Sequence, residues 1–289
     1  MTEENDKLIG QVAQGNALGA VQVMGGADDA LMRVNHLLYG PMSPGDDSAL
    51  DGLMAGYADH ATGGEGADSV LAAYNIGCIK LAQEDIYEAK MRFGEVLRVQ
   101  PENLLARHNL GLAHELLADI DEAKTEYSRV LAQNPDSVIT RINLSQIKLQ
   151  EADYEGALAD LEGLYNNDSS NPGLLYHYAK ALLTRASSSD IQRVVDLIEA
   201  HPDGESLGPL QECRGFAYFL LGDMETAEGV FTALLGREEG NLYALMGMIK
   251  INAAKPNFDA ILDFARRFQA ISPNEKIGQL LEAYQESEF

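Results

Sequence analysis

The sequence repeats itself with a period of 34 residues, and this periodicity constrains the fold more than any other feature of the chain. Gly77 and Gly111 are one period apart, and so are Ala89 and Ala123. In the first three copies and the fifth, an alanine follows the small residue after twelve positions, and a bulky apolar residue follows four positions later. A period of this length indicates a row of similar units that bury their apolar faces against their neighbours. Further members of the pattern are Phe93, Tyr127, Pro101, Pro135, Ser145, Ala157, Leu161, Gly215, Ala227 and Phe231.

Each copy contains two stretches with apolar residues at helical spacing. Over residues 122–131, for example, Ala123, Tyr127 and Val130 fall on one stripe. Pro135 follows this stretch and ends it, because proline cannot donate the i→i−4 hydrogen bond. A small residue at the glycine position allows the two helices of one copy to approach closely. The pattern therefore predicts helix-turn-helix units.

These positions resemble the tetratricopeptide repeat, whose pattern includes a Leu-Gly pair, an alanine, an aromatic residue and a closing proline. The resemblance covers roughly residues 69–274 and is weaker in the fourth copy (173–204) than in the others; the sixth copy spans 241–273. It implies an all-α fold: a right-handed superhelix, or α-solenoid, of about six helix-turn-helix repeats with a concave inner face.

The two ends of the chain differ from the repeats in composition. Residues 1–68 carry 12 of the 27 glycines and a formal charge of −9. The helical pair expected there is either a degenerate repeat or an N-terminal cap. The predicted domains are a flexible N-terminal segment (1–26), the helical pair (27–60), a Gly-rich linker (61–69), the tetratricopeptide-repeat array (70–273) and a C-terminal cap helix (274–289).

The charge of the chain excludes several classes of partner. There are 45 acidic residues against 21 Lys+Arg, which gives a formal charge of −24. Nucleic acid is not an expected partner, because phosphate binding needs clustered cations. No apolar run is long enough for membrane insertion. The start of the chain is acidic, and Cys78 and Cys213 are expected to be reduced and buried, so we predict a cytoplasmic protein. The acidity reflects either a high-salt environment or an ordinary acidic scaffold.

Motifs for catalysis, cofactors or metals are missing from the sequence. His114-Glu115 resembles the start of a zinc-protease helix, but Ala118 stands where the second histidine would be. Residues 119–122 resemble part of a calcium loop without its glycine and distal glutamate. We therefore predict a protein that is not an enzyme and that has no cofactor and no metal site.

Asn75, Asn109 and Asn143 form a ladder with a spacing of one repeat. In the family that the chain resembles, the first helix of each repeat lines the concave face. Asparagine at such a place can donate to a peptide carbonyl and accept from a peptide N–H. The alternative is that these amides bond neighbouring parts of the repeat, and the sequence leaves both interpretations open. The ladder stops at His177 and Cys213, which favours a groove in the first three repeats.

The neighbours of the ladder are largely apolar, which suits a hydrophobic or amphipathic peptide. Some members of the family hold the C-terminal carboxylate of heat-shock chaperones with a Lys/Asn/Arg clamp. Here Tyr74, Ile139 and Asn143 stand at clamp positions, so chaperone-tail binding is not expected. The predicted peptide-binding residues are Asn75, Asn109, Asn143, Leu71, Tyr74, Leu105, His108, Leu112, Ile139 and Ile142.

These features predict a non-enzymatic protein–protein interaction scaffold or adaptor. Its concave groove would hold an extended or amphipathic segment of a partner protein. The alternative is a self-assembling platform, a homo-oligomer in which the N-terminal segment 8–24 docks in its own or a neighbour's groove.

Overall fold

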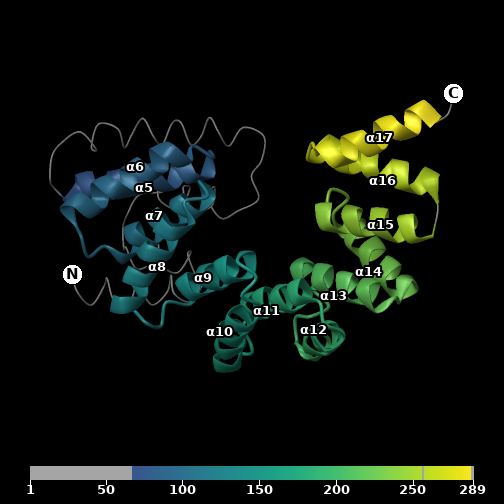
Figure 1. Ribbon diagram of the computed structural model, residues 1–289, viewed down its shortest axis with the longest axis horizontal. Helices are drawn as coiled ribbons and strands as arrows, with labels where there is room; N and C mark the ends of the chain where they lie inside the picture. Colours follow the sequence, from purple (N-terminus) through teal and green to yellow (C-terminus); the bar gives the residue numbers. More distant parts are fainter. Residues whose placement is uncertain (1–66, 256, 288–289) are drawn as a thin grey trace. The chain divides into compact units, whose positions relative to one another are not determined.

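Residues 67–255 and 257–287 are described by a computed structural model, and every regular element within them is an α-helix (Figure 1). The predicted all-α fold is therefore confirmed. The predicted segments 1–26 and 27–60 lie outside the described residues. The thirteen helices of the described residues are α5 (Ala67–Ala82), α6 (Ile86–Val99), α7 (Leu104–Leu116), α8 (Ile120–Gln133), α9 (Val138–Gln150), α10 (Tyr154–Asn167), α11 (Pro172–Arg185), α12 (Ser188–Ala200), α13 (Gly208–Leu221), α14 (Met224–Arg237), α15 (Leu242–Ala254), α16 (Phe258–Ile271) and α17 (Glu275–Ser287).

The helices follow one another as six pairs and a final single helix, as the repeat pattern predicts. The first helix of each pair has an odd number, and α17 stands where the C-terminal cap helix was expected. The described array begins earlier than predicted, because α5 starts at Ala67, inside the predicted linker 61–69. Gly66 is the last glycine before this helix, and the residues after it are compatible with helix. The chain divides into two compact units, Met1–Ile147 and Lys148–Phe289, with the boundary inside α9.

Most helices begin at a polar residue that caps the backbone. The side chain of each such residue accepts a hydrogen bond from an N–H group of the first turn, which has no partner inside the helix. Pro172 and Pro209 stand at the start of their helices, where no N–H donor is required. The capping residues are Asp85, Asn103, Asp153, Asn171, Ser187, Asp223, Asn241 and Asn257.

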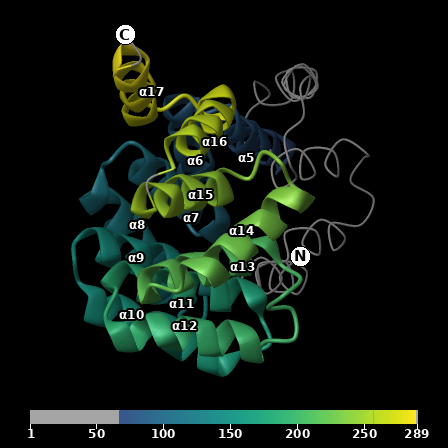
Figure 2. The ribbon, with the colours of Figure 1, turned by 90° about the vertical axis from the view of Figure 1, so that its right-hand side faces the viewer.

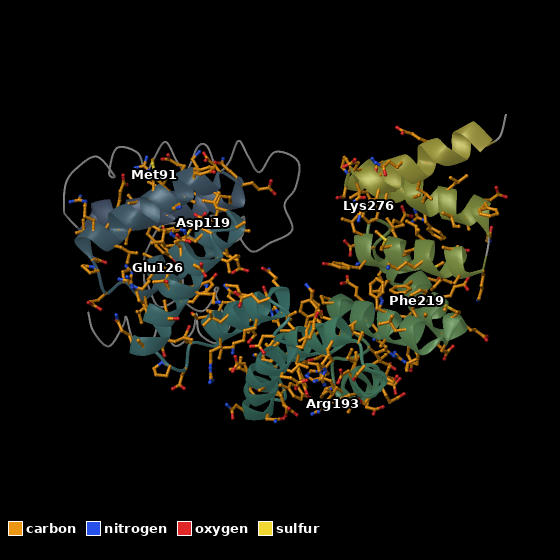
Figure 3. All side chains as sticks on the ribbon, in the orientation of Figure 1. Met91, Asp119, Glu126, Arg193, Phe219 and Lys276 are labelled. Carbon is orange, nitrogen blue, oxygen red and sulfur yellow. The ribbon has the colours of Figure 1, made fainter. Side chains whose placement is uncertain are left out.

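Asp119 precedes α8 but uses its carboxylate differently (Figure 3). It accepts hydrogen bonds from Lys90 Nζ at 3.0 Å and lies 3.2 Å from His114 Nδ1. Lys90 belongs to α6, so this carboxylate joins the first repeat to the second. The residues that resembled fragments of zinc and calcium motifs are therefore part of a contact between repeats.

The backbone of the turn inside each of the first five repeats is left-handed at one residue. In the first four repeats this residue is Glu84, Ala118, Ala152 or Ala186, with φ between 56° and 63°. They are spaced by 34 residues, and the fourth repeat, which is weak in sequence, keeps the same spacing. Gly222 takes this conformation in the fifth repeat with φ 85°. The backbone thus repeats more strictly than the sequence does.

In the first, second and fifth repeats the glycine of the first helix faces an aromatic ring of the second helix. A Cβ atom added to Gly111 would lie 2.7 Å from the ring of Tyr127, and one added to Gly215 would lie 2.6 Å from the ring of Phe231. Both distances are shorter than any real contact between carbon atoms. A Cβ on Gly247, in the next repeat, would also meet Phe231. The prediction that small residues allow close helix approach is confirmed.

Each unit has its own apolar core. In the first unit, Ala89, Phe93 and Val96 of α6 pack with Ala106 of α7. In the second unit a continuous core runs from α13 to α17, whose succession can be followed in Figure 2. Ile277 of α17 is 7% exposed and belongs to this core. The last helix therefore covers apolar surface that the sixth repeat would otherwise expose.

Candidate functional site

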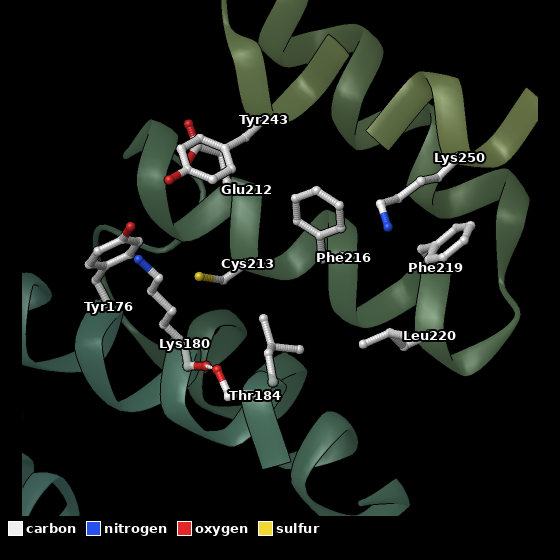
Figure 4. A pocket seen from close by; sticks show the side chains of 11 residues that line it. Tyr176, Lys180, Thr184, Glu212, Cys213, Phe216, Phe219, Leu220, Tyr243 and Lys250 are labelled. Atoms are coloured by element: carbon white, nitrogen blue, oxygen red, sulfur yellow. Dashed lines mark hydrogen bonds between the residues drawn. The ribbon is translucent and has the colours of Figure 1, made fainter. Parts of the chain in front are cut away.

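An apolar pocket of about 300 Å³ opens on the first helices of the last three repeats (Figure 4). In this unit α11 packs against α13, and α13 packs against α15, so the three helices form a continuous surface. The pocket lies on that surface. Its lining consists of Tyr176, Lys180, Leu183, Thr184, Glu212, Cys213, Phe216, Phe219, Leu220, Tyr243 and Lys250.

The pocket combines a fixed aromatic floor with exposed apolar side chains. The ring of Phe216 packs edge-on against buried Phe231, with the ring centroids 5.1 Å apart. Leu220 is 47% exposed and Tyr243 is 51% exposed, and both line the opening. Apolar surface that stays exposed around a concave site is typical of surfaces that bind another molecule. The pocket can therefore receive a large apolar side chain.

Two lysines stand on opposite sides of the pocket, Lys180 on α11 and Lys250 on α15 (Figure 4). The Lys180 ammonium lies 5.7 Å from the centre of the Tyr176 ring, within the range of a cation–π contact. Among the described residues, no carboxylate lies within 4.0 Å of either ammonium group. Burial raises the pKa of Tyr176 to about 12, so its phenol stays neutral beside the cation.

The pocket also contains one carboxylate and one thiol. Glu212 is 9% exposed and accepts a hydrogen bond from Asn241 Nδ2 at 2.8 Å. Burial raises the pKa of this carboxyl above its usual range. Burial also raises the pKa of the Cys213 thiol to about 12, which keeps the sulfur protonated and a poor nucleophile. The lining therefore suits binding better than covalent chemistry.

The predicted asparagine ladder lies in the first unit, and two of its amides donate to tyrosines. Asn109 Nδ2 donates to Tyr74 Oη at 3.1 Å, and Asn143 Nδ2 donates to Tyr127 Oη at 3.0 Å. Asn75 is 4% exposed, and its Nδ2 has no hydrogen-bond partner among the described residues. The structure thus brings Asn109 and Tyr74 together, in a contact that links two successive repeats.

The other predicted groove residues are mostly packed into the repeats. His108 Nδ1 lies 3.0 Å from Thr140 Oγ1, and its ring lies 5.4 Å from that of Tyr127. Burial lowers the pKa of His108 to about 4, so the imidazole is neutral at physiological pH. Ile142 is buried. Leu105, Leu112 and Ile139 are partly buried, and the side chain of Leu71 is outside the described part of the chain.

The pocket residues were not predicted as a site, although they share the register of the predicted groove. Cys213 occupies the ladder position of the fifth repeat. Tyr176 and Glu212 stand one residue before that position in their repeats, and Lys180 and Phe216 stand three residues after it. Extending the register of the groove, and not its asparagines, into the fourth and fifth repeats would have found these residues.

Comparison with known proteins agrees with the repeat architecture. Residues 74–138 match the family model of the tetratricopeptide repeat. The described helices have the fold of a tetratricopeptide-repeat array. A tetratricopeptide-repeat protein from Parabacteroides merdae has a similar crystal structure with a TM-score of 0.66 and 16% identity, over 97% of each chain.

Two further solved structures share this fold. Yeast Tom70 is 12% identical with a TM-score of 0.62, over 91% of this chain and 65% of Tom70. A chain from the APC/C hetero-tetramer Cut9–Hcn1 is 15% identical with a TM-score of 0.63, over 96% of this chain and 52% of that one. At these identities the likeness shows the fold alone. No curated protein is significantly similar to the chain.

Metal-ligand clusters and membrane-spanning helices are both missing from the described residues. They contain no group of three or more His, Cys, Asp or Glu side chains that could hold a metal ion. None of the described helices has both the length and the apolar character needed to cross a bilayer. The pocket on α11, α13 and α15 is the candidate site.

Proposed function

We propose that this protein is a non-enzymatic interaction scaffold or adaptor that binds an extended or amphipathic segment of a partner protein. The segment would lie on the first-helix face of the repeats. The observation that carries the proposal is the pocket on α11, α13 and α15, with exposed Leu220 and Tyr243 at its opening. The fold is shared with a chain from the Cut9–Hcn1 hetero-tetramer, a protein assembly, which supports the same class of function.

A pocket of this kind favours recognition through one anchoring side chain. An apolar group that enters it replaces water on Phe216, Phe219 and Leu220 together. Few residues dominate the binding energy of such contacts, and they lie where water is most completely excluded. The remaining contacts would come from the first-helix surface on either side of the pocket.

Two adjacent leucines provide the test. Leu220 and Leu221 are 47% and 40% exposed, but only Leu220 lines the pocket. Full-length protein is immobilised and used to select from a random dodecapeptide library displayed on phage, and the affinity of the selected peptides is then measured by fluorescence anisotropy. Leu220→Ala should weaken binding, and its combination with Tyr243→Ala should weaken it at least tenfold, on the order expected for anchor contacts. The Leu221→Ala control should bind as the wild type does.

The binding measurements show whether a peptide binds at the pocket or elsewhere on the surface. Failure to enrich any peptide, or equal loss of binding in Leu220→Ala and Leu221→Ala, would overturn the proposal. Melting curves of all variants check that the fold is retained, which we expect because these side chains are largely exposed.

The asparagine ladder of the first unit remains a second part of the proposal. The bonds that Asn109 and Asn143 make to tyrosines favour the packing interpretation over the ligand interpretation for these two residues. The double change Asn109→Ala and Asn143→Ala distinguishes them. A ligand role predicts weaker peptide binding at unchanged melting temperature, and a packing role predicts that the melting temperature falls.

The alternative function is a self-assembling platform, and sedimentation tests it. The segment 8–24 that would dock lies outside the described residues. A full-length protein that sediments as a monomer over a wide concentration range would exclude the platform. A concentration-dependent oligomer would favour it over the scaffold.

A further inference from the structure

Lysine is scarce in this chain, yet two lysines line the pocket. The pocket therefore differs in charge from the protein as a whole, which is strongly negative. The protein has a formal charge of −24, and two of its nine lysines, Lys180 and Lys250, line the one pocket described above. The lining holds a single carboxylate, that of Glu212. The pocket is therefore a locally positive site on an acidic molecule.

Other cations of the same unit are mostly neutralised by ion pairs. Arg185 pairs with Glu155 and with Asp190, and Arg193 pairs with Glu162 at 2.6 Å. Lysines follow the same pattern, because Lys148 pairs with Asp160 at 2.5 Å, and Lys255 pairs with Glu228 at 3.5 Å.

Lys180 and Lys250 differ from these cations. Both are exposed, and no carboxylate of the described residues lies within ion-pair distance of either. Their ammonium groups stand on opposite sides of an apolar opening (Figure 4). The Lys180 charge acts on the Glu212 carboxyl, whose pKa it lowers against the larger effect of burial, but neither lysine is held in an ion pair. Two cations against one carboxylate leave charge that a ligand can complement.

Building on the proposed function, we propose that the pocket binds a partner segment in which an aromatic or large aliphatic residue is flanked on both sides by Asp or Glu. The apolar side chain would enter between Phe216 and Leu220. The flanking carboxylates would reach the ammonium groups of Lys180 and Lys250. Recognition would require carboxylates within the segment and not the carboxylate at a chain end.

The carboxylate of Glu212 does not reverse the preference of the pocket for acidic residues in the ligand. This carboxylate accepts the Asn241 amide hydrogen bond at 2.8 Å, and Asn241 caps α15. The carboxyl is thus held toward the start of α15 and is 9% exposed. The two lysines, in contrast, are exposed to an approaching ligand. A basic segment would meet both ammonium groups at the opening, and like charges at that distance repel.

The experiment compares three amidated synthetic dodecapeptides, each with one central Phe, in which the flanking residues are Glu, Gln or Lys. Their affinities for full-length protein are measured by fluorescence anisotropy. The expected order is Glu above Gln above Lys. In the double variant Lys180→Gln and Lys250→Gln, binding of the Glu peptide should fall about fivefold, toward that of the Gln peptide, as expected for the loss of two exposed ion pairs. Added salt should weaken the Glu peptide in the wild type and not in the variant.

Lys255→Gln is the matched control. Lys255 stands five residues after Lys250, is exposed and does not line the pocket, so its loss should leave all three affinities unchanged. Equal binding of the Glu and Gln peptides, or preference for the Lys peptide, would overturn the inferred charge preference. A Glu peptide that binds only with a free C-terminal carboxylate would also overturn it.

The same measurements separate this inference from the proposed function. If all peptides with Phe bind alike and lose binding in Leu220→Ala, the scaffold function stands and the charge preference is wrong. If no peptide binds above an Ala-centred control, the pocket does not bind peptides and both proposals fail. Self-association that disappears in the double lysine variant would identify a second copy as the occupant and overturn the partner proposed here.

Discussion

Asn143 and Tyr127 are joined by a hydrogen bond in which Asn143 Nδ2 donates to the phenolic oxygen at 3.0 Å. The same phenol donates to Glu115 Oε2 at 2.9 Å. Tyr127 is fully buried, and burial raises its pKa above its usual range, so it remains a donor. The hydroxyl thus connects α7, α8 and α9 within the first unit.

Removal of this hydroxyl should destabilise the first unit. In Tyr127→Phe the Asn143 amide stays buried without its acceptor, which costs about 1–3 kcal/mol of unfolding free energy. Urea denaturation followed by circular dichroism measures the change. Tyr87→Phe is the control, because Tyr87 is 73% exposed and should be neutral. Equal stability of both variants would show that the hydroxyl contributes nothing.

Gly215 and Gly229 should respond to alanine with opposite signs. Alanine at Gly215 places a Cβ 2.6 Å from the ring of Phe231, whereas the space around Gly229 is open. Gly215→Ala should therefore destabilise by about 1–3 kcal/mol, as overpacking does. Gly229→Ala, inside α14, should stabilise by up to about 1 kcal/mol through helix propensity. Thermal unfolding of the two variants checks the prediction, and a shared sign would contradict it.

Replacing Ala152 by glycine should stabilise the protein. Ala152 has φ 63°, a left-handed conformation that costs an alanine roughly 1 kcal/mol more than a glycine. Ala152→Gly should raise the midpoint of urea unfolding. Ala159→Gly, at an exposed position inside α10, should lower it by a similar amount. A loss of stability in both variants would show that the turn conformation is not strained.

The ion pair between Arg185 and Asp190 should contribute more to the free energy of unfolding than the exposed pair between Arg185 and Glu155. Arg185 Nε donates to Asp190 Oδ2 at 2.7 Å, and the side chain of Asp190 is 5% exposed. Hydrogen bonds from Arg185 lower the pKa of Asp190 to about 2, so this contribution is present above the ordinary pKa of Asp and is lost as the pH falls toward about 2.

Arg185→Ala leaves the carboxylate of Asp190 without its cation and should lower the free energy of unfolding at neutral pH. The carboxylate of Glu155, the other partner of Arg185, is 84% exposed, so Glu155→Gln should change stability by less than about 1 kcal/mol. Denaturant unfolding of both variants measures the contrast. Equal effects would mean that burial of Asp190 has no energetic consequence.

His108 should make the stability depend on pH. Burial lowers its pKa to about 4, whereas an unfolded histidine titrates near 6.5. Below about pH 6.5 the unfolded chain binds a proton that the folded chain does not, so stability falls as the pH drops toward about 4, by up to about 1.4 kcal/mol per unit. Above that range the residue has no effect.

His108→Gln removes this titration and provides the comparison. The unfolding free energy of the wild type should fall more than that of the variant between about pH 7 and pH 5.5. Parallel pH profiles for the two proteins would show that His108 is protonated equally in the folded and unfolded chains.

The repeat architecture could be predicted from the sequence because the helical spacing of apolar residues and the 34-residue period indicate the same helix pairs. Gly111 and the ring of Tyr127, for example, are in close contact, and the 34-residue spacing identifies both residues as repeat positions. The left-handed turn at Ala118 and Ala186 could not be predicted, because alanine does not signal that conformation.

The candidate site was harder to predict than the fold. The asparagine ladder stood out because identical residues recur, yet Asn109 and Asn143 use their amides inside the protein. The pocket is built from unlike residues, such as Lys180 and Phe216, which have only their register in common. Binding surfaces vary in side chain while the backbone repeats, so chemical identity is a weaker guide to them than position.

The contact of Phe231 with both Gly215 and Gly247 has a consequence for cooperativity. One ring is held between the first helix of its own repeat and that of the next, so neither helix can leave without exposing it. In a linear array this is a nearest-neighbour coupling term. Amide protons in the middle of α13 and α15 should therefore exchange through one shared opening event. Through the Phe231 ring, local unfolding of one of these helices should extend to the other.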